Sequence, residues 1–138
     1  MSVSQTAPGA GGTPLCKFTE LAGRVLLAAI FLISGIEKLG GYAGTAGYMA
    51  AAGVPGALLP LVIATEIGGS LAIIVGWHTR IVAFLLAGFT LLSAGIFHSH
   101  FADQTQMVMF MKNVSITGGF LLLVANGAGP LCLDARRG

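Results

Sequence analysis

Four long runs of apolar and small residues, separated by short polar or glycine-rich links, dominate the pattern of this sequence. A helix of about 20 such residues is long enough to cross the ~30 Å hydrocarbon layer of a bilayer. The runs predict membrane spans over about residues 18–38, 57–76, 79–97 and 107–126. Because short links make successive helices antiparallel, we expect an all-α fold, an integral membrane four-helix antiparallel bundle.

The segments outside these spans differ from them in composition. Residues 39–56 contain too many glycines to span a membrane and are too apolar for a free loop. We expect them to form a short interfacial segment after the first helix, with Tyr42 and Tyr48 at the level of the headgroups. Residues 1–17 are rich in Gly, Pro, Ser and Thr and predict a mobile tail, and residues 135–138 predict a short C-terminal tail.

Composition supports a membrane protein and argues against several soluble classes. Of the 138 residues, 55% are hydrophobic and only 9% are charged, which is unusual for a soluble globular domain. The formal net charge of +2 involves no basic cluster, so the lipid bilayer is an expected partner and nucleic acid is not. Cys16 and Cys132 have the spacing of neither a zinc site nor a redox dithiol, so no metal centre is expected and the role of the two thiols stays open.

The distribution of positive charge predicts the orientation in the membrane. Most of the basic residues are expected on the side that carries both termini and few on the other: Lys17, Arg24, Arg80, Arg136 and Arg137 against Lys38 and Lys112. Basic residues are enriched on the cytoplasmic side of membrane proteins. Both termini are therefore expected in the cytoplasm.

Helical spacing predicts which residues of a span share a face. One face of the first span carries a cation near each end and consists of Arg24, Ala28, Phe31, Gly35 and Lys38. One face of the fourth span is small and polar and consists of Lys112, Ser115, Ile116, Gly119 and Asn126. Snorkelling of the cations to the headgroups is the alternative to an inward role.

A single carboxylate, Glu66, lies near the middle of the second span. An ionised carboxylate costs a few kcal/mol in the membrane unless it is paired or faces a polar cavity. Counted from the helix ends, Arg24 and Lys112 lie roughly 6 Å from the depth of Glu66, within reach of long side chains. We therefore predict a buried polar cluster of Glu66, Arg24 and Lys112, with Asn113 and Ser70 as hydrogen-bond partners. A purely structural ion pair is the alternative.

Three more polar residues are expected at the opening of the bundle on the side away from the termini, the predicted periplasmic mouth: Lys38, His98 and His100. One residue, Ser99, separates the two histidines, a spacing that places them on different faces of a helix. An ordinary helix-end or loop role is the first interpretation. Metal binding and proton handling are the alternatives.

The motifs GR-x6-FLISGIEKL, GYMAAAGVPG, ATEIGGSLAIIVGWHTR and KNVSITGGFLLLVANG, in this order, together resemble the DoxX family of small bacterial inner-membrane proteins. The resemblance covers residues 20–134 and implies a DoxX-like four-helix transmembrane domain over 18–134 in a bacterial inner membrane. It also implies an association with thiosulfate:quinone oxidoreduction, terminal oxidases or thiol and oxidative-stress homeostasis. The family positions that match here are Arg24, Lys38, Glu66, Lys112 and Asn113.

Two functions of different class are compatible with these features. In the first, the protein is a redox-associated subunit whose polar cluster engages a quinone headgroup or relays protons for a partner oxidoreductase subunit that holds the cofactor. In the second, it is a non-catalytic assembly partner or a small-solute permease. No covalently bound cofactor is expected, because the chain has no haem-ligand pair and no nucleotide motif. A homo-oligomer is compatible with both functions.

Overall fold

The structure, a computed structural model, describes residues 14–129 and 131. In chain order, the described part contains α1 (Pro14–Gly40), α2 (Tyr42–Ala51), the 3-10 turn η1 (Gly56–Leu58), α3 (Leu59–Val75), α4 (Thr79–Phe97) and α5 (Gln104–Asn126). Four helical stretches are long and apolar enough to cross a membrane: 14–40, 56–75, 79–97 and 104–126. The predicted all-α fold with four membrane-spanning helices is therefore confirmed.

The ends of the helices differ from the sequence prediction at several points. Residues 14–17 were expected in the tail but form the start of α1, and Glu37 and Lys38 lie inside α1 instead of closing it. The fourth span starts at Gln104, where the Asp103 side chain caps the helix by accepting from the Thr105 N–H at 2.9 Å. Residues 1–13, the tail over 135–138, and Cys132, Arg136 and Arg137 lie outside the described residues.

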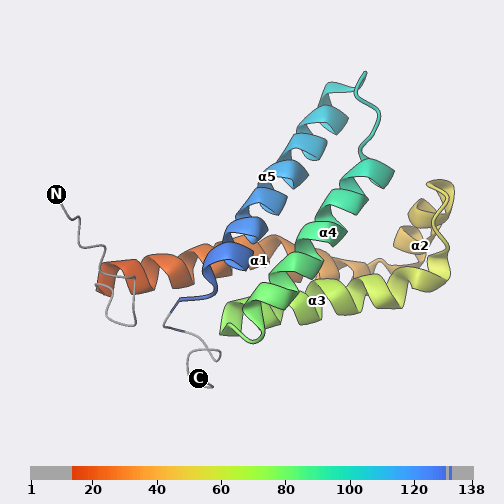
Figure 1. The fold of residues 1–138 in the computed structure, drawn as a ribbon. Helices are drawn as coiled ribbons and strands as arrows, with labels where there is room; N and C mark the ends of the chain where they lie inside the picture. Colours follow the sequence, from red (N-terminus) through yellow and green to blue (C-terminus); the bar gives the residue numbers. More distant parts are fainter. Residues whose placement is uncertain (1–13, 130, 132–138) are drawn as a thin grey trace.

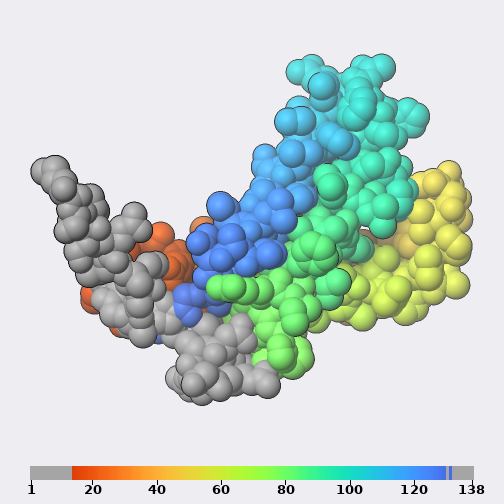
Figure 2. Space-filling model, in the orientation of Figure 1, coloured from red at the N-terminus to blue at the C-terminus, as the bar shows by residue number. Residues whose placement is uncertain are grey.

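The four long helices form two antiparallel pairs, α1 with α3 and α4 with α5 (Figure 1). The pairs meet where α3 turns into α4, and they diverge toward the end of α4 and the start of α5. We call the first region the closed end and the second the open end. The space-filling view shows the same divergence, with the yellow α2 beside the end of α4 (Figure 2). The bundle is thus a wedge.

Close helix contacts hold the wedge together at the places where glycine removes a side chain. A Cβ atom added at Gly35 of α1 would lie 2.6 Å from Ile67 Cγ1 of α3, and one added at Gly69 of α3 would lie 2.9 Å from Leu86 Cδ2 of α4. Small residues at helix interfaces allow backbones to approach closely in membranes. Gly35 thus sets the approach of α1 to α3, and Gly69 sets the approach of α3 to α4.

The buried face of α1 matches the sequence prediction. Its buried residues are Arg24, Ala28, Phe31 and Gly35. Phe31 packs on Phe120 of α5, with ring centroids 5.4 Å apart, within a core that joins α1, α3, α4 and α5. The same helical period therefore places both apolar contacts and a buried cation on one side of this helix.

The small, polar face described for the fourth span is partly turned inward: Ile116 packs against the core, and a Cβ added at Gly119 would lie 3.2 Å from Leu27 Cδ1 of α1. The buried residues of α5 are Thr117 and Phe120, while Lys112 and Ser115 are exposed. Only 6% of the span's most apolar window is buried, against 22–28% in the other three spans. Because apolar side chains surround α5 on most sides, its sequence pattern does not favour one rotation over another.

The segment between the first two spans is a short helix, α2, that packs against the ends of longer ones. Met49 is buried against Leu59 and Ile63 of α3, and the Tyr48 ring stacks on Phe97 of α4 at 5.3 Å between centroids. Gly53, with φ of 85°, then reverses the chain toward η1. The helix α2 thus links the two pairs at the open end.

Candidate functional site

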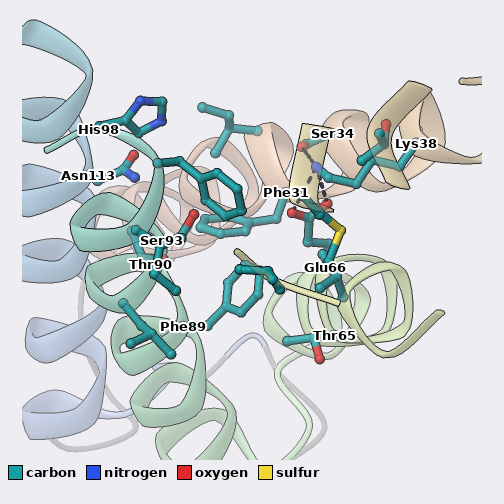
Figure 3. Close-up of a pocket in the computed structure, with 18 of the residues that line it drawn as sticks. Phe31, Ser34, Lys38, Thr65, Glu66, Phe89, Thr90, Ser93, His98 and Asn113 are labelled. Atoms are coloured by element: carbon teal, nitrogen blue, oxygen red, sulfur yellow. Dashed lines mark hydrogen bonds and ion pairs between the residues drawn. The ribbon is translucent and has the colours of Figure 1, made fainter. Parts of the chain in front are cut away.

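A cavity of about 530 Å³ lies inside the wedge and is lined by residues from α1, α2, α3, α4 and α5. Apolar and aromatic side chains form most of its wall, and Phe31 and Phe89 lie at its centre in the close-up (Figure 3). The volume falls within the range of roughly 300–1,000 Å³ that is common for small-molecule sites. The cavity is therefore large enough for a ligand.

An ion pair lies at one wall of the cavity. Lys38 Nζ of α1 is 3.0 Å from both Oε1 and Oε2 of Glu66 of α3, and it also donates to Ser34 Oγ at 2.6 Å. Glu66 is buried, with a side chain only 6% exposed, while that of Lys38 is 22% exposed. Among the described residues this is the only salt bridge.

Local structure explains why these three residues meet. Ser34 and Lys38 are four residues apart on α1, so their side chains lie on the same face. The contact at Gly35, between them, brings α3 close, and Glu66 Cβ would lie 3.3 Å from a Cβ at that glycine. The pair therefore forms beside the close contact between α1 and α3 at Gly35.

The structure corrects the predicted partners of Glu66. The depth comparison selected Arg24 and Lys112, whereas the carboxylate pairs with Lys38, which was expected at the predicted periplasmic mouth. The comparison counted depth from the predicted helix ends, whereas α1 begins at Pro14 and ends at Gly40, beyond both of them. The depth of a residue in the membrane also does not say which helices are neighbours or in which direction each side chain points.

Arg24 is buried at the closed end, with 1% of its surface exposed, and it binds backbone carbonyls. Its guanidinium donates to Ile73 O at 3.0 Å, to Ile74 O at 3.1 Å and to Leu131 O. These carbonyls belong to the last turn of α3 and to the segment after α5. Arg24 thus caps the C-terminal end of α3, where a cation is favourable, and links it to the segment that follows α5.

Lys112 and Asn113 line the same cavity as the ion pair but from α5. Lys112 is exposed and Asn113 is half-buried. Ser70, the other expected hydrogen-bond partner, donates instead to the Ile67 carbonyl at 2.9 Å within its own helix. Four residues of the predicted cluster thus occupy different positions: Glu66 at one wall, Lys112 and Asn113 on the α5 side, and Arg24 at the closed end.

The two histidines separate in the structure. His98 lines the cavity, and its Nδ1 lies 3.0 Å from Gln106 Oε1, which links the end of α4 to the start of α5. His100 is exposed in the following link and does not line the cavity. Nowhere in residues 14–129 do three or more His, Cys, Asp or Glu side chains gather as metal ligands would. Cys16 is exposed near the start of α1.

Sequence reasoning missed several residues of the cavity. Ser34 could have been found from its spacing of four residues before Lys38. The aromatic residue Phe89 and the hydroxyls of Thr90 and Ser93 gave no signal, because such residues are common in any membrane span. Only the divergence of the helix pairs turns these side chains into a cavity wall.

The chemical character of the cavity follows from the placement of its polar groups. In the close-up, Ser34, Lys38 and Glu66 lie on one side and His98 and Asn113 on the opposite side, with the aromatic rings between them (Figure 3). Such a space suits a flat or elongated apolar molecule with polar groups at its ends.

Fold and cavity together define a small four-span membrane protein with an amphipathic cavity between two helix pairs. The chain belongs to the DoxX family, whose family pattern matches residues 19–99. It is 53% identical over 114 residues to the inner membrane protein YqjF of Escherichia coli strain K12, covering 83% of this chain and 88% of that protein. It is also 40% identical over 124 residues to the inner membrane protein YphA of the same strain, covering 84% and 88% respectively. No solved structure matches the chain.

Proposed function

We propose that this DoxX-family chain is an inner-membrane subunit whose cavity engages the headgroup of a quinone-like molecule, next to a partner oxidoreductase subunit that holds the redox cofactor. The observation that carries the proposal is the Lys38–Glu66 pair at the wall of an apolar cavity of about 530 Å³. The relatives named inner membrane proteins support the location.

The residues of the cavity fit such a headgroup. The Lys38 ammonium is a donor of the kind that a carbonyl oxygen accepts, and Ser34 and Glu66 fix its position at 2.6 and 3.0 Å. Aromatic faces at Phe31 and Phe89 suit a flat ring. When bound, a quinone would supply electron and proton transfer, and the chain's part would be to bind, orient and exclude water.

The Glu66 carboxylate could also transfer a proton. A carboxylate that is buried next to a cation can accept a proton and return it, provided that an acceptor comes within hydrogen-bond distance. Lys38 and Glu66 both line the cavity, and the Lys38 side chain is 22% exposed, so a ligand in the cavity can approach the pair. Lys38 would then hold the carboxylate in place while the proton moves.

A non-catalytic role, as an assembly partner or a small-solute permease, is the contrasting function. An assembly role alone would need no free space beside Glu66, and the cavity there favours ligand binding instead. In that case the ion pair between Lys38 and Glu66 would serve only to connect α1 to α3.

The test is mass spectrometry of quinones that stay bound after extraction in a mild non-ionic detergent. The wild-type chain is expected to retain quinone, and Glu66→Gln is expected to retain about tenfold less, because a charge-assisted contact is worth roughly 1.5–3 kcal/mol. Glu37→Gln is the matched control. Glu37 is an exposed carboxylate on α1, next to Lys38 in the sequence, and it does not line the cavity. Wild-type protein without quinone, or equal retention in all three chains, would contradict the proposal.

A further inference from the structure

On its α5 side the cavity is lined by two polar side chains that have no hydrogen-bond or ion-pair partner in the described part of the chain. Lys112 and Asn113 both line the cavity. Across residues 14–129 and 131, neither the Lys112 ammonium nor the Asn113 side-chain amide makes a hydrogen bond or an ion pair. The Asn113 backbone carbonyl is used separately, as the acceptor for Thr117 Oγ1 at 2.8 Å.

The charges around the cavity do not balance. Its charged lining residues are Lys38, Glu66 and Lys112. Glu66 neutralises Lys38 through the ion pair, which leaves the positive charge of Lys112 without compensation. An uncompensated charge at an apolar wall is costly, and Lys112 lies eight residues after the start of α5, roughly 12 Å along the helix. An anion beside Lys112 would remove this cost.

Lys112, Asn113 and His98 form a polar corner of the cavity, where the start of α5 meets the end of α4. In the close-up, Asn113 lies next to His98, across the cavity from the Lys38–Glu66 pair (Figure 3). His98 is held by Gln106 at 3.0 Å, so the start of α5 is fixed relative to the end of α4 at this point. The corner therefore offers a cation and an amide on a wall that a side-chain contact keeps in place.

The cavity opens to the hydrocarbon layer. Its lining includes apolar residues that the chain leaves exposed, among them Leu61 at 63%, Leu92 at 65% and Ile96 at 38%. On a membrane-spanning helix, such side chains face lipid tails. A ligand with an apolar body can enter sideways from the bilayer, whereas a small water-soluble anion would have to cross apolar surface.

We propose that Lys112 and Asn113 form a subsite for the anionic head, a carboxylate or a phosphate, of a single-chain amphiphile whose apolar body lies against Phe31 and Phe89. This inference goes beyond the proposed function, because the headgroup of a quinone is neutral and the subsite uses Lys112 instead of the Lys38–Glu66 pair. One anionic ligand would contact both side chains and would compensate the positive charge of Lys112.

The test compares two probes that differ only in the head, oleate and its neutral analogue oleamide. Binding to the full chain is measured by native mass spectrometry in a non-ionic detergent. Oleate is expected to bind about tenfold or more tightly than oleamide, because an ionised partner strengthens a hydrogen bond. Lys112→Gln is expected to abolish this preference and Lys112→Arg to retain it. Lys17→Gln, on the partly exposed lysine near the start of α1, is the control and is expected to retain it.

A third probe, oleyl phosphate, separates the two sources of the head. A preference for oleyl phosphate over oleate supports the subsite with a lipid phosphate as its ligand, and the opposite preference supports it with a fatty carboxylate. Equal binding of oleate and oleamide, or an unchanged preference in Lys112→Gln, would overturn the inference and leave Lys112 as a snorkelling cation. Quinone retention, measured on the same Lys112→Gln preparation, is expected to stay at the wild-type level, so this inference and the quinone proposal fail separately.

Discussion

Lys38 Nζ lies 3.0 Å from both carboxylate oxygens of Glu66, a residue 28 positions later in the chain. The pair joins α1 to α3 and at the same time forms part of the cavity wall. A buried ion pair often contributes little net stability, because desolvation offsets the attraction, whereas removing one partner alone is costly. A structural role and a binding role therefore have different experimental consequences.

A double-mutant cycle measures the structural part of the pair. Lys38→Met and Glu66→Gln are each expected to lower the free energy of unfolding by about 1–3 kcal/mol, because each leaves a buried polar group without its partner. The double variant is expected to lose less unfolding free energy than the two single variants lose together, which corresponds to a coupling energy of about 0.5–3 kcal/mol. Equilibrium unfolding in detergent micelles measures all four chains. Strictly additive losses would show that the two residues do not interact.

Gly35→Ala tests whether the close approach of α1 to α3 is required. The added methyl would lie 2.6 Å from Ile67 Cγ1, so either the Ile67 side chain or the two helices must shift, at a cost of about 1–3 kcal/mol in unfolding free energy. Gly23→Ala is the matched control on the same helix, because a Cβ there meets nothing within 4 Å. That control is expected to be neutral or to stabilise α1 by up to about 1 kcal/mol.

Shortening the opposing side chain gives a second check on Gly35. In the double variant Gly35→Ala/Ile67→Ala, the atom that the new methyl would strike is gone. The double variant is expected to be more stable than the sum of the two single effects predicts. Equal stability of Gly35→Ala and Gly23→Ala would mean that the approach is not tight.

Arg24→Gln tests the cap at the closed end. The substitution removes the guanidinium that donates to Ile73 O and Ile74 O, and each lost charged hydrogen bond is worth about 1.5–3 kcal/mol. The last turn of α3 is expected to loosen, which shifts the fluorescence of Trp77, the single tryptophan of the chain. Arg24→Lys is expected to give an intermediate result, because an ammonium lacks the planar fork. An unchanged spectrum and unchanged stability in Arg24→Gln would contradict the capping role.

Orientation in the membrane is tested with reporters at the ends of the chain. Fusions of green fluorescent protein to either terminus are expected to fluoresce, and alkaline phosphatase fusions at the same points are expected to be inactive, because both termini are predicted in the cytoplasm. A phosphatase inserted in the link that contains His100 is expected to be active. The reverse pattern would show that the charge bias does not set the orientation of this chain.

Much of the fold could be predicted from local pattern alone. The length of the apolar runs determines four spans, since a helix must satisfy its own backbone hydrogen bonds in the hydrocarbon layer. The period of 3.6 residues places Arg24, Ala28, Phe31 and Gly35 on the buried face of α1, as observed. The rotation of α5 about its axis was not predicted: its buried residues are Thr117 and Phe120, and its apolar side chains are spread around the helix without a strong directional signal.

For the candidate site, the sequence by itself determined that Glu66 needs a cationic partner, because a lone charge in the membrane is too costly. Tertiary structure alone decided that the partner is Lys38, that Arg24 instead caps α3, and that the helix pairs diverge around a cavity. The sequence gives the position of a residue along the axis of its own helix. The neighbour of each helix and its rotation about its axis depend on packing between distant segments, such as Gly35 against Ile67, and these contacts exist only in the folded chain.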